Sequence, residues 1–236
     1  MAMTAEVRRC TQIHGAPLGT LMFSDHCPGE PGRSRTAPER ATMSRRRNER
    51  KESMHYLSHY ESPLGAMTMA SDGEYLTGLW FDGQKYDRST IDDDAVLQPR
   101  LPVFMQTAQW LGAYFEGTDP GFTPPISIEG SDFRKMVTSI MLSIPFGATS
   151  TYARIAAEVA RRTGRKQMSA QAVGGAVGHN PITLIVPCHR VLASDGSLRG
   201  YAGGVDRKER LLEMEGVNMA GLSTPPIADD GGGRRE

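Results

Sequence analysis

The sequence predicts an α+β protein: a small N-terminal sheet-plus-helix domain followed by a mostly helical domain with a helix-turn-helix. Strand-like segments come first, apolar residues then recur at helical spacing, and a Pro/Gly-rich linker over residues 118–130 separates the two groups. The predicted domains are residues 54–130, linker included, and residues 131–216. Residues 1–53 and 217–236 are predicted to be disordered tails.

Apolar residues in the N-terminal tail recur neither at the strand period nor at the helix period, and the tail is rich in Pro, Gly, Ser, Thr and Arg. Such a segment buries too little apolar surface to offset the conformational entropy lost on ordering. Its run Arg45–Arg47 is a candidate contact for nucleic acid, although a solvated, disordered segment is the simpler interpretation. We hypothesise that the translated product begins at Met43 or Met54. The tail also offers a metal-binding alternative, formed by Cys10, His14, His26 and Cys27.

In the N-terminal domain, residues 56–70 and 75–81 are predicted strands, separated by the turn signal at residues 71–73. Asp92–Asp94 is predicted to be a loop. Pro102 opens a helix that Gly117 ends. One face of this helix carries Val103, Thr107, Trp110, Leu111, Tyr114 and Phe115.

Four helices are predicted in the second domain. The first carries Phe133, Val137, Ile140 and Met141 and stops before Pro145. The second covers residues 151–162, with Ile155 and Val159 inward. The third covers residues 170–177, with Ser169 as N-cap and Gly178 at its end. The last begins at a capping-box-like Asp206 and Glu209 and runs to Glu215.

The second and third of these helices form the helix-turn-helix, joined by a connection that contains Arg161, Arg162, Arg165 and Lys166. The third helix contains Gly174 and Gly175, each costing about 1 kcal/mol relative to Ala. Such small residues indicate that something packs closely against this helix. Many helical hairpins bind nothing, so the pattern alone leaves the function open.

Composition excludes several classes of protein. The 27 basic and 27 acidic residues balance, but residues 54–130 carry a net charge of −8 and residues 131–216 carry +5. The second domain is therefore the better candidate for binding an anionic partner, and the first domain for a supporting role.

No apolar run is long enough for a membrane span or a secretory signal. Three cysteines are too few for a disulfide scaffold, which favours a reducing, cytoplasmic setting.

The chemistry centres on Cys188, which follows an apolar strand-like run and precedes His189 and Arg190. A cysteine reacts as thiolate, and nearby positive charge lowers its pKa from about 8.5. His189 can act as base, through a bridging water because adjacent side chains seldom bond directly, and Glu215 can orient it. The alternatives are an inert buried cysteine and, with less support, a zinc ligand; no metal-binding pair of the usual spacing accompanies Cys188.

Pro187-Cys188-His189-Arg190-Val191, preceded by Asn180-Pro181 and followed by Tyr201-Ala202-Gly203-Gly204, closely resembles the O6-alkylguanine-DNA alkyltransferases, also called methylated-DNA–protein-cysteine methyltransferases. The resemblance covers residues 56–216 and is strongest over residues 144–215. It implies a ribonuclease H-like N-terminal domain and a winged helix-turn-helix-like second domain. The family transfers an alkyl group from O6 of guanine in double-stranded DNA, with O4-alkylthymine as a further candidate, irreversibly to its own cysteine. No cofactor takes part in this reaction. No metal site is predicted for this chain, and since nothing in the sequence indicates an oligomer, a monomer is expected.

The resemblance also assigns catalytic roles. Cys188 corresponds to the acceptor nucleophile, His189 to the residue that acts through water, and Glu215 to its carboxylate partner. Asn180 corresponds to the residue that organises the active-site turn. Arg190 is interpreted as structural, bonding loop carbonyls.

For the substrate pocket, the resemblance assigns Tyr152 as a donor toward the flipped base, Tyr201 as a lining residue and Lys208 as a lysine near the site. The Val191 carbonyl corresponds to the group that faces the guanine amino group, and the Ala202 N–H to the donor toward O6.

The DNA-binding helix is assigned in the same way, with Ala170, Gly174 and Gly175 on its small face in the minor groove. The family commonly has an arginine here that replaces the flipped base in the stack, whereas this chain has Gln171. Gln reaches far enough but lacks the planar cation. Either Gln171 fills the stack or a basic residue of the preceding connection assists.

Two other readings of the sequence compete with alkyl transfer. A non-catalytic lesion binder or DNA-binding regulator is disfavoured by the presence of Cys188, because members of the wider family that only bind damage lack this cysteine. A Cys-His hydrolase needs an oxyanion hole, and nothing in the sequence marks one.

Overall fold

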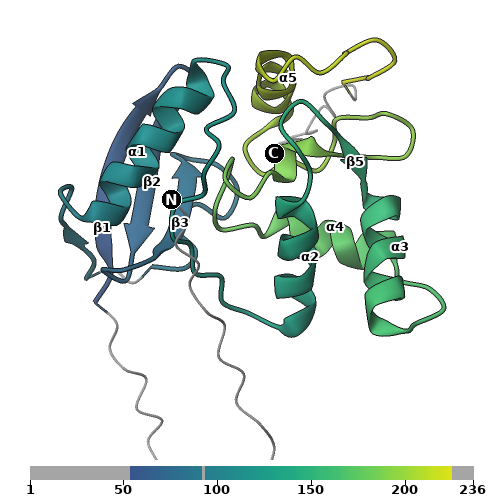
Figure 1. The fold of residues 1–236 in the computed structure, drawn as a ribbon, viewed down its shortest axis with the longest axis horizontal. Coiled ribbons are helices and arrows are strands. Elements are labelled where there is room, and N and C mark those ends of the chain that lie inside the picture. The colour runs from purple at the N-terminus through teal and green to yellow at the C-terminus, as the bar shows by residue number, and fades with distance from the viewer. Residues whose placement is uncertain (1–53, 92–93, 225–236) are drawn as a thin grey trace, which may run out of the picture. The chain divides into compact units, whose positions relative to one another are not determined.

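The computed structural model describes residues 54–91 and 94–224 and has the predicted α+β organisation, with a sheet and one helix first and a helical part after them (Figure 1). The predictions for the N-terminal tail lie outside the described residues, including Met43, the Arg45–Arg47 run and the proposed metal cluster. The same is true of Asp92 and Asp93 in the acidic loop.

The N-terminal sheet has four strands: β1 (Tyr56–Ser62), β2 (Gly65–Ser71), β3 (Leu76–Phe81) and β4 (Val96–Leu97). Their order is β3-β2-β1-β4. Strands β1, β2 and β3 pair antiparallel, while the short β4 pairs parallel with β1. Strand β3 therefore forms one edge of the sheet.

The prediction of one long strand over residues 56–70 is wrong, because the chain turns back at Pro63 and Leu64 to form the β1–β2 hairpin. Ser62 pairs with Gly65, and its Oγ donates to the Gly65 carbonyl at 2.6 Å. Gly65 has a φ of +117°, a conformation that glycine adopts without a Cβ clash. Pro63 has no N–H to donate to a neighbouring strand, so Pro63 and Gly65 together mark this turn.

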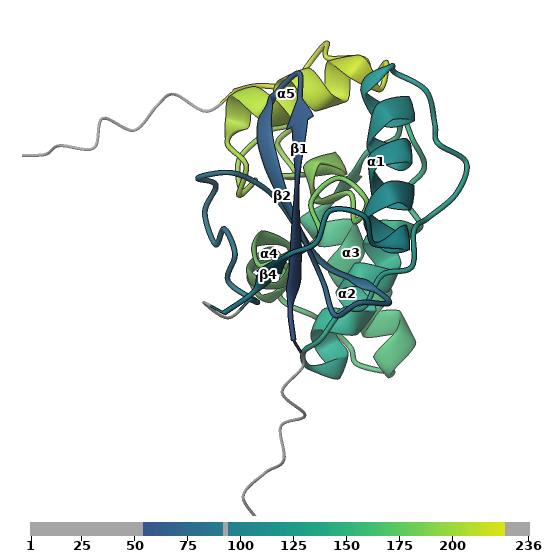
Figure 2. The same ribbon diagram turned by 90° about the vertical axis from the view of Figure 1, so that its left-hand side faces the viewer.

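Helix α1 (Pro102–Phe115) begins at Pro102 as predicted and lies against strands β1 and β2 (Figure 2). Its buried side chains are Val103, Phe104, Thr107, Trp110, Leu111 and Tyr114. Five of these belong to the predicted inward face; Phe104 is additional, and Phe115 is only half-buried. Since α1 spans the sheet, its C-terminal turn brings Tyr114 to the Cys188 site described below.

The second part contains helices α2 (Asp132–Leu142), α3 (Tyr152–Thr163), α4 (Ala170–Gly178) and α5 (Val205–Met214). Ser131, Thr151 and Ser169 cap the first three, each accepting a backbone N–H three residues on. Helices α3 and α4 pack together as the predicted helix-turn-helix. In the described part of the chain, no helix is both long and apolar enough to cross a bilayer.

Two local predictions in this part are wrong. The N-cap of α5 is Gly204, whose φ of +93° turns the backbone into the helix. Asp206 therefore lies inside the first turn and forms no capping box with Glu209. The apolar run before Cys188 is not a strand: residues 183–185 form turns, with Leu184 at a φ of +71°. The 3₁₀ helix η1 (Cys188–Arg190) follows these turns.

Short pairings then hold the turn of Cys188 in place. Strand β6 (Val191–Leu192) pairs parallel with β5 (Ser150–Thr151), immediately before α3. The edge strand β3 bonds to the segment before Cys188: the Leu79 N–H donates to the Pro181 carbonyl at 2.8 Å, and the Thr183 N–H donates to the Leu79 carbonyl at 2.9 Å. The sheet thus supports the segment that carries the reactive residue.

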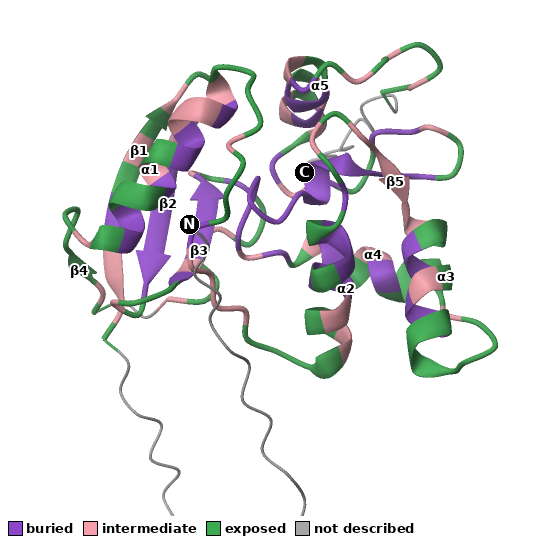
Figure 3. Cartoon of the chain, in the orientation of Figure 1, coloured by how far each residue is buried: buried purple, intermediate pink, exposed green. Residues whose placement is uncertain are grey.

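One hydrophobic core runs through both predicted domains (Figure 3). It contains Leu79 and Phe81 from β3, Leu111 from α1, and Ile155 and Val173 from the helical part. The two parts are therefore packed together through apolar side chains rather than joined only by the linker.

Residues 217–224 extend the ordered chain past the predicted boundary. Val217, Met219 and Leu222 pack on the small cluster of Leu192, Leu198 and Leu212, and Ser223 pairs with Ser197. The predicted disorder is therefore wrong for residues 217–224. Residues 225–236 lie outside the described ranges.

Candidate active site around Cys188

The side-chain amide of Asn180 organises the turn that holds Cys188. Its Nδ2 lies 3.0 Å from Cys188 Sγ, 2.9 Å from the Val186 carbonyl and 3.1 Å from the Ile182 carbonyl. Its Oδ1 accepts the Ile182 N–H at 3.1 Å. A single buried side chain thus joins both ends of the turn to the sulfur.

His189 and Glu215 form a buried pair next to this turn. His189 Nε2 lies 2.7 Å from Glu215 Oε1, and both side chains are inaccessible to solvent. Arg190 forms a two-pronged contact with the same carboxylate, Nε to Oε2 at 2.8 Å and Nη2 to Oε1 at 3.0 Å. Arg190 also donates to the Ile144 carbonyl at 2.7 Å, so it bonds one carbonyl, as predicted, and in addition neutralises the carboxylate.

Two further donors complete the environment of Glu215. The Gly147 N–H lies 3.1 Å from Oε2, and the Tyr114 hydroxyl lies 2.8 Å from Oε1. Burial raises the pKa of Glu215, but hydrogen bonds and charge from His189 and Arg190 outweigh burial and lower the pKa to about 2. Glu215 is therefore an anion at neutral pH, held by four residues from three separate segments.

The Cys188 thiol is almost fully buried, with 5% of the residue exposed. Burial raises its pKa, and the hydrogen bond from Asn180 and the charge of Lys208 offset only part of the rise. The predicted lowering by neighbouring positive charge is present, from Lys208, but burial outweighs it and the net pKa is raised. Because the thiol is protonated at neutral pH, a nearby base must remove its proton before the sulfur reacts.

His189 is placed to be that base. Burial lowers its pKa, against the opposing effect of Glu215, so the imidazole is neutral at pH 7. Its Nε2 faces Glu215, and its Nδ1 is buried with no hydrogen-bond partner among the described protein atoms. Within the same ranges no direct hydrogen bond joins the side chains of Cys188 and His189, as expected for adjacent residues, and the relay through water stays a prediction.

Lys208 lies on the other side of Cys188 and is fully buried. Its Nζ donates to the Val191 carbonyl at 2.6 Å and to the Arg199 carbonyl at 3.4 Å. Burial lowers the pKa of Lys208 to about 8, while Cys188 raises it. A carbonyl has two lone pairs, so the Val191 oxygen still has capacity for a second donor.

A cleft of about 390 Å³ opens beside these residues, within the size range of small-ligand sites. It brings together four of the predicted pocket and DNA-facing residues, Gly174, Gly175, Tyr201 and Ala202. Its remaining lining residues are Lys85, Tyr86, Gly178, His179 and Gly200. Cys188 does not line this cleft, but its charge affects the pKa of Tyr201, which does.

Two tyrosines lie close enough to Cys188 for its charge to affect their pKa values. The Tyr152 hydroxyl donates to the carbonyls of Arg199 and Gly200 at 3.3 and 3.4 Å. Burial, and then Cys188, raise the pKa of Tyr152 to about 12, so the hydroxyl keeps its proton. Tyr201 is buried, and its hydroxyl has no hydrogen-bond partner among the described residues.

Glycines fix the positions of both rings. A Cβ on Gly200 would lie 2.4 Å from the Tyr152 hydroxyl oxygen, and one on Gly203 would lie 2.6 Å from Tyr201 Cε1. Real Cβ atoms do not approach other atoms so closely, so larger residues at either position would displace a pocket tyrosine.

Helix α4 presents the exposed residues Ala170, Gln171 and Gly175 to solvent. A Cβ on Gly175 would meet no protein atom within 4 Å, so packing inside the protein does not explain this glycine. Arg161 and Arg162 were predicted in the connection before α4 but lie in the last turn of α3, where both bind Glu158, at 2.7 Å each. Helix α4 therefore has a small, uncharged outer face.

The sequence did not identify several residues of the site. Tyr114 looked like one more core residue in an apolar helical stripe, and Gly147 like part of a loop. The N-terminal loop also reaches the cleft: the Lys85 N–H donates to the Ala202 carbonyl at 3.2 Å, and the Tyr86 ring stacks on His179 at 4.2 Å. No local signal distinguished these residues, because they gain their positions from the packing of the two parts.

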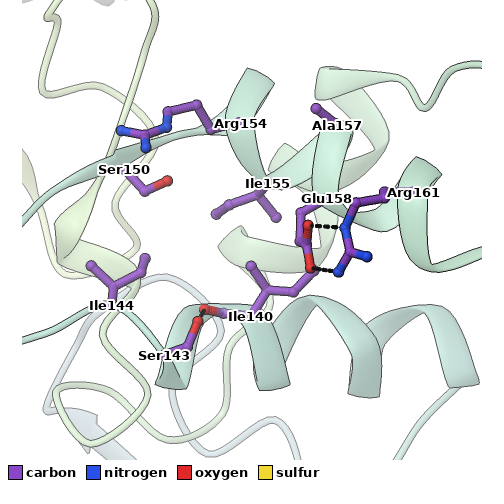
Figure 4. Close-up of a pocket in the computed structure, with 9 residues that line it drawn as sticks. All are labelled: Ile140, Ser143, Ile144, Ser150, Arg154, Ile155, Ala157, Glu158 and Arg161. Atoms are coloured by element: carbon purple, nitrogen blue, oxygen red, sulfur yellow. Dashed lines mark hydrogen bonds and ion pairs between the residues drawn. The ribbon is translucent and has the colours of Figure 1, made fainter.

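A second cleft, of about 430 Å³, lies between α2 and α3 (Figure 4). Its walls are apolar at Ile140, Ile144 and Ile155, and its carboxylate, Glu158, bonds to Arg161. Of its lining residues, Ile144 contacts the Cys188 site, through the carbonyl that accepts from Arg190, and none is a predicted site residue, so the chemistry is assigned to the first cleft.

Comparison with known proteins agrees with this geometry. Residues 55–128 match the family model described as the ribonuclease-like domain of 6-O-methylguanine DNA methyltransferase, and residues 132–217 match its DNA binding domain. The methylated-DNA–protein-cysteine methyltransferase of Mycobacterium tuberculosis is 39% identical over 160 residues, 66% of this chain and 92% of that protein. The Haemophilus influenzae protein of the same name is 34% identical over 163 residues, 69% of this chain and 87% of that protein.

A solved structure shows the same fold. The crystal structure of Mycobacterium tuberculosis OGT in complex with DNA matches with a TM-score of 0.59 and 38% identity, covering 68% of this chain and 92% of that one.

Proposed function

Because this chain belongs to the 6-O-methylguanine DNA methyltransferase family, we propose that Cys188 accepts the alkyl group from O6-alkylguanine in DNA. The protein is a DNA-repair enzyme of the methylated-DNA–protein-cysteine methyltransferase type, and DNA is its partner. The observation that supports the role of Cys188 is its place between Asn180 and Lys208, beside the buried His189–Glu215 pair.

The proposed reaction begins with removal of the thiol proton. A water relays this proton to Nδ1 of the neutral His189, and Glu215 stabilises the imidazolium that results. Lys208 and the Asn180 amide then stabilise the thiolate, because each favours negative charge on sulfur. The buried cysteine is thus protonated at rest and ionised only during transfer.

The thiolate then displaces guanine from the alkyl carbon. A carbon–sulfur bond forms as the carbon–O6 bond breaks, and the bonding pair leaves with the guanine, which takes up a proton. The Ala202 N–H and the Tyr152 hydroxyl are the proposed donors that stabilise the departing base, and a pKa of about 12 keeps the tyrosine protonated. The product thioether has no route back to a thiol, so each molecule acts once.

The target base must leave the duplex to reach this site. Flipping costs a few kcal/mol, less where pairing is already damaged. We assign the small outer face of α4, with Ala170, Gly174 and Gly175, to the minor groove, where a missing side chain allows close approach. The cleft behind this helix then receives the base against Tyr201. The Val191 carbonyl, which accepts from Lys208, is the proposed acceptor for the guanine amino group.

Intact-mass measurement tests this function directly. After incubation with excess O6-benzylguanine, the full chain is expected to gain the mass of one benzyl group, located on the Cys188 peptide. Repeated release of product from one protein molecule would instead identify a hydrolase. A complete lack of adduct, together with retained binding to damaged DNA, would identify a non-catalytic binder, which the presence of Cys188 disfavours.

Gln171 is proposed to fill the space that the flipped base leaves, since it lies exposed on the first turn of α4. Gln171→Ala is expected to lower the rate of transfer from an O6-methylguanine duplex about tenfold, because an unfilled stack costs roughly 1 kcal/mol or more. Transfer from free O6-benzylguanine, which needs no flipping, should stay at the wild-type rate. Equal duplex rates for variant and wild type would exclude Gln171 and point to the basic connection before α4.

The reaction needs a reduced thiol, and a reducing compartment keeps it so. On this ground we propose that the protein acts in the cytoplasm, as a monomer.

A further inference from the structure

Tyr114 brings the N-terminal domain into contact with the acid–base pair. It lies in the last turn of α1 and is fully buried, with its ring stacked on Trp110 at 5.2 Å and edge-on to Phe146 at 6.0 Å. Its hydroxyl lies 2.8 Å from Glu215 Oε1 and 3.2 Å from His189 Nε2. These two ring contacts, together with an edge-on contact with Phe115 at 5.5 Å, hold one hydroxyl against both members of the pair.

The positions of the hydrogen atoms follow from these contacts. Glu215 is ionised and only accepts, so the single hydroxyl hydrogen of Tyr114 goes to Oε1. Nε2 of His189 then faces two acceptors, the carboxylate at 2.7 Å and the tyrosine oxygen at 3.2 Å. Nε2 must therefore carry the hydrogen, which leaves the lone pair of the neutral ring on Nδ1.

We propose that Tyr114 is a positioning residue for alkyl transfer, which fixes the Nε2–H form of His189 and tunes Glu215 as its partner. This inference rests on the proposed function, since it assigns His189 as the base that receives the thiol proton. It gives the acidic N-terminal domain a part in the chemistry through α1, beyond its contribution to the core.

The Tyr114 hydroxyl lowers the pKa of His189. It donates to the Glu215 carboxylate and so draws negative charge away from the side of the carboxylate that faces His189. Without it, Glu215 binds the imidazolium more strongly, and the pKa of His189 rises. The weaker contact at 3.2 Å acts in the opposite direction. The charged and titratable groups that face the pair stay unchanged; they are Arg190, Lys208, Cys188 and Tyr201.

The test compares the full-length wild type with Tyr114→Phe, which removes only the hydroxyl. A matched control is Tyr60→Phe, a tyrosine of the same domain that stacks on Phe115 and makes no contact with the pair. The rate of benzyl transfer from free O6-benzylguanine is measured across roughly pH 5 to 9. Nitrogen-15 NMR titration of His189 is recorded on the same proteins.

In Tyr114→Phe we expect a rate about fivefold lower at pH 7 and an acid limb shifted to higher pH by about half a unit. The His189 titration should shift in the same direction, and the control should match wild type in both measurements. A superimposable rate profile and titration would overturn the inference. A lower rate with an unmoved midpoint in both measurements would also overturn it, because it would show a packing role alone.

Failure of the proposed function has a different signature. If wild type itself gains no benzyl group, transfer to Cys188 is refuted. The NMR comparison then still decides whether the Tyr114 hydroxyl controls His189, because it needs no substrate.

Discussion

Cys188→Ala is expected to gain no alkyl group from either an O6-methylguanine duplex or free O6-benzylguanine, while wild type gains one. The loss is complete, because no other cysteine lies among the described residues and the remaining nucleophiles of the site are a buried amine and tyrosines with raised pKa values. Intact-mass spectrometry of the two proteins after the same incubation measures this difference.

DNA binding should survive the same substitution. Cys188 does not line the cleft, and Asn180 keeps its bonds to the Ile182 and Val186 carbonyls without the sulfur. The affinity of Cys188→Ala for a damaged duplex is therefore expected within about twofold of wild type, as measured by fluorescence anisotropy. If circular dichroism instead shows that Cys188→Ala is unfolded, the main role of Cys188 is packing in the core rather than alkyl transfer.

Local chemistry explains why much of the fold was predictable. Pro102 at a helix start, Ser169 as an N-cap and the apolar stripe of α1 are short-range signals, and each is confirmed. The β1–β2 hairpin escapes prediction because the strand predicted over residues 56–70 includes Pro63 and Gly65, which in the structure mark the turn between β1 and β2. The turn before Cys188 was missed because its apolar residues are buried on all sides, which removes the alternation that separates strands from turns.

For the site, the motif residues were predictable and their environment was not. Asn180, Cys188 and His189 lie within ten positions of one another, so their spacing is visible in the chain. Tyr114 lies 101 positions from Glu215, and only the packing of α1 against the helical part joins them. The net pKa of Cys188 is unpredictable from the sequence for the same reason: Lys208 lowers it as expected, but burial outweighs this effect and depends on contacts that no local pattern encodes.

Glu215→Gln is expected to cause the largest loss of stability of any single isosteric change in the site. The carboxylate is the anionic partner of Arg190, whose side chain is only 9% exposed, and it also accepts from Tyr114, His189 and Gly147. Removing one member of a buried pair leaves an uncompensated charge and costs about 3–5 kcal/mol. Chemical denaturation should show this loss, with exposed Glu213→Gln on α5 as a control near wild type.

Transfer should slow in the same variant, because a neutral amide stabilises the His189 imidazolium far less than a carboxylate does. We expect the rate with free O6-benzylguanine to fall at least a hundredfold at pH 7, corresponding to about 3 kcal/mol. A variant that is destabilised but transfers at the wild-type rate would remove Glu215 from the relay and leave it a structural role.

The acid dependence of stability provides an independent check on the same carboxylate. Folding lowers the pKa of Glu215 from 4.5 to about 2, so its contribution is fully present above the unfolded value and disappears as the pH falls toward 2. A shift of this size corresponds to about 3 kcal/mol. The stability difference between wild type and Glu215→Gln should therefore be constant above about pH 5 and shrink steadily below it, as followed by denaturation at each pH. A difference that stays constant down to about pH 3 would show that the carboxylate is not held as an anion by His189 and Arg190.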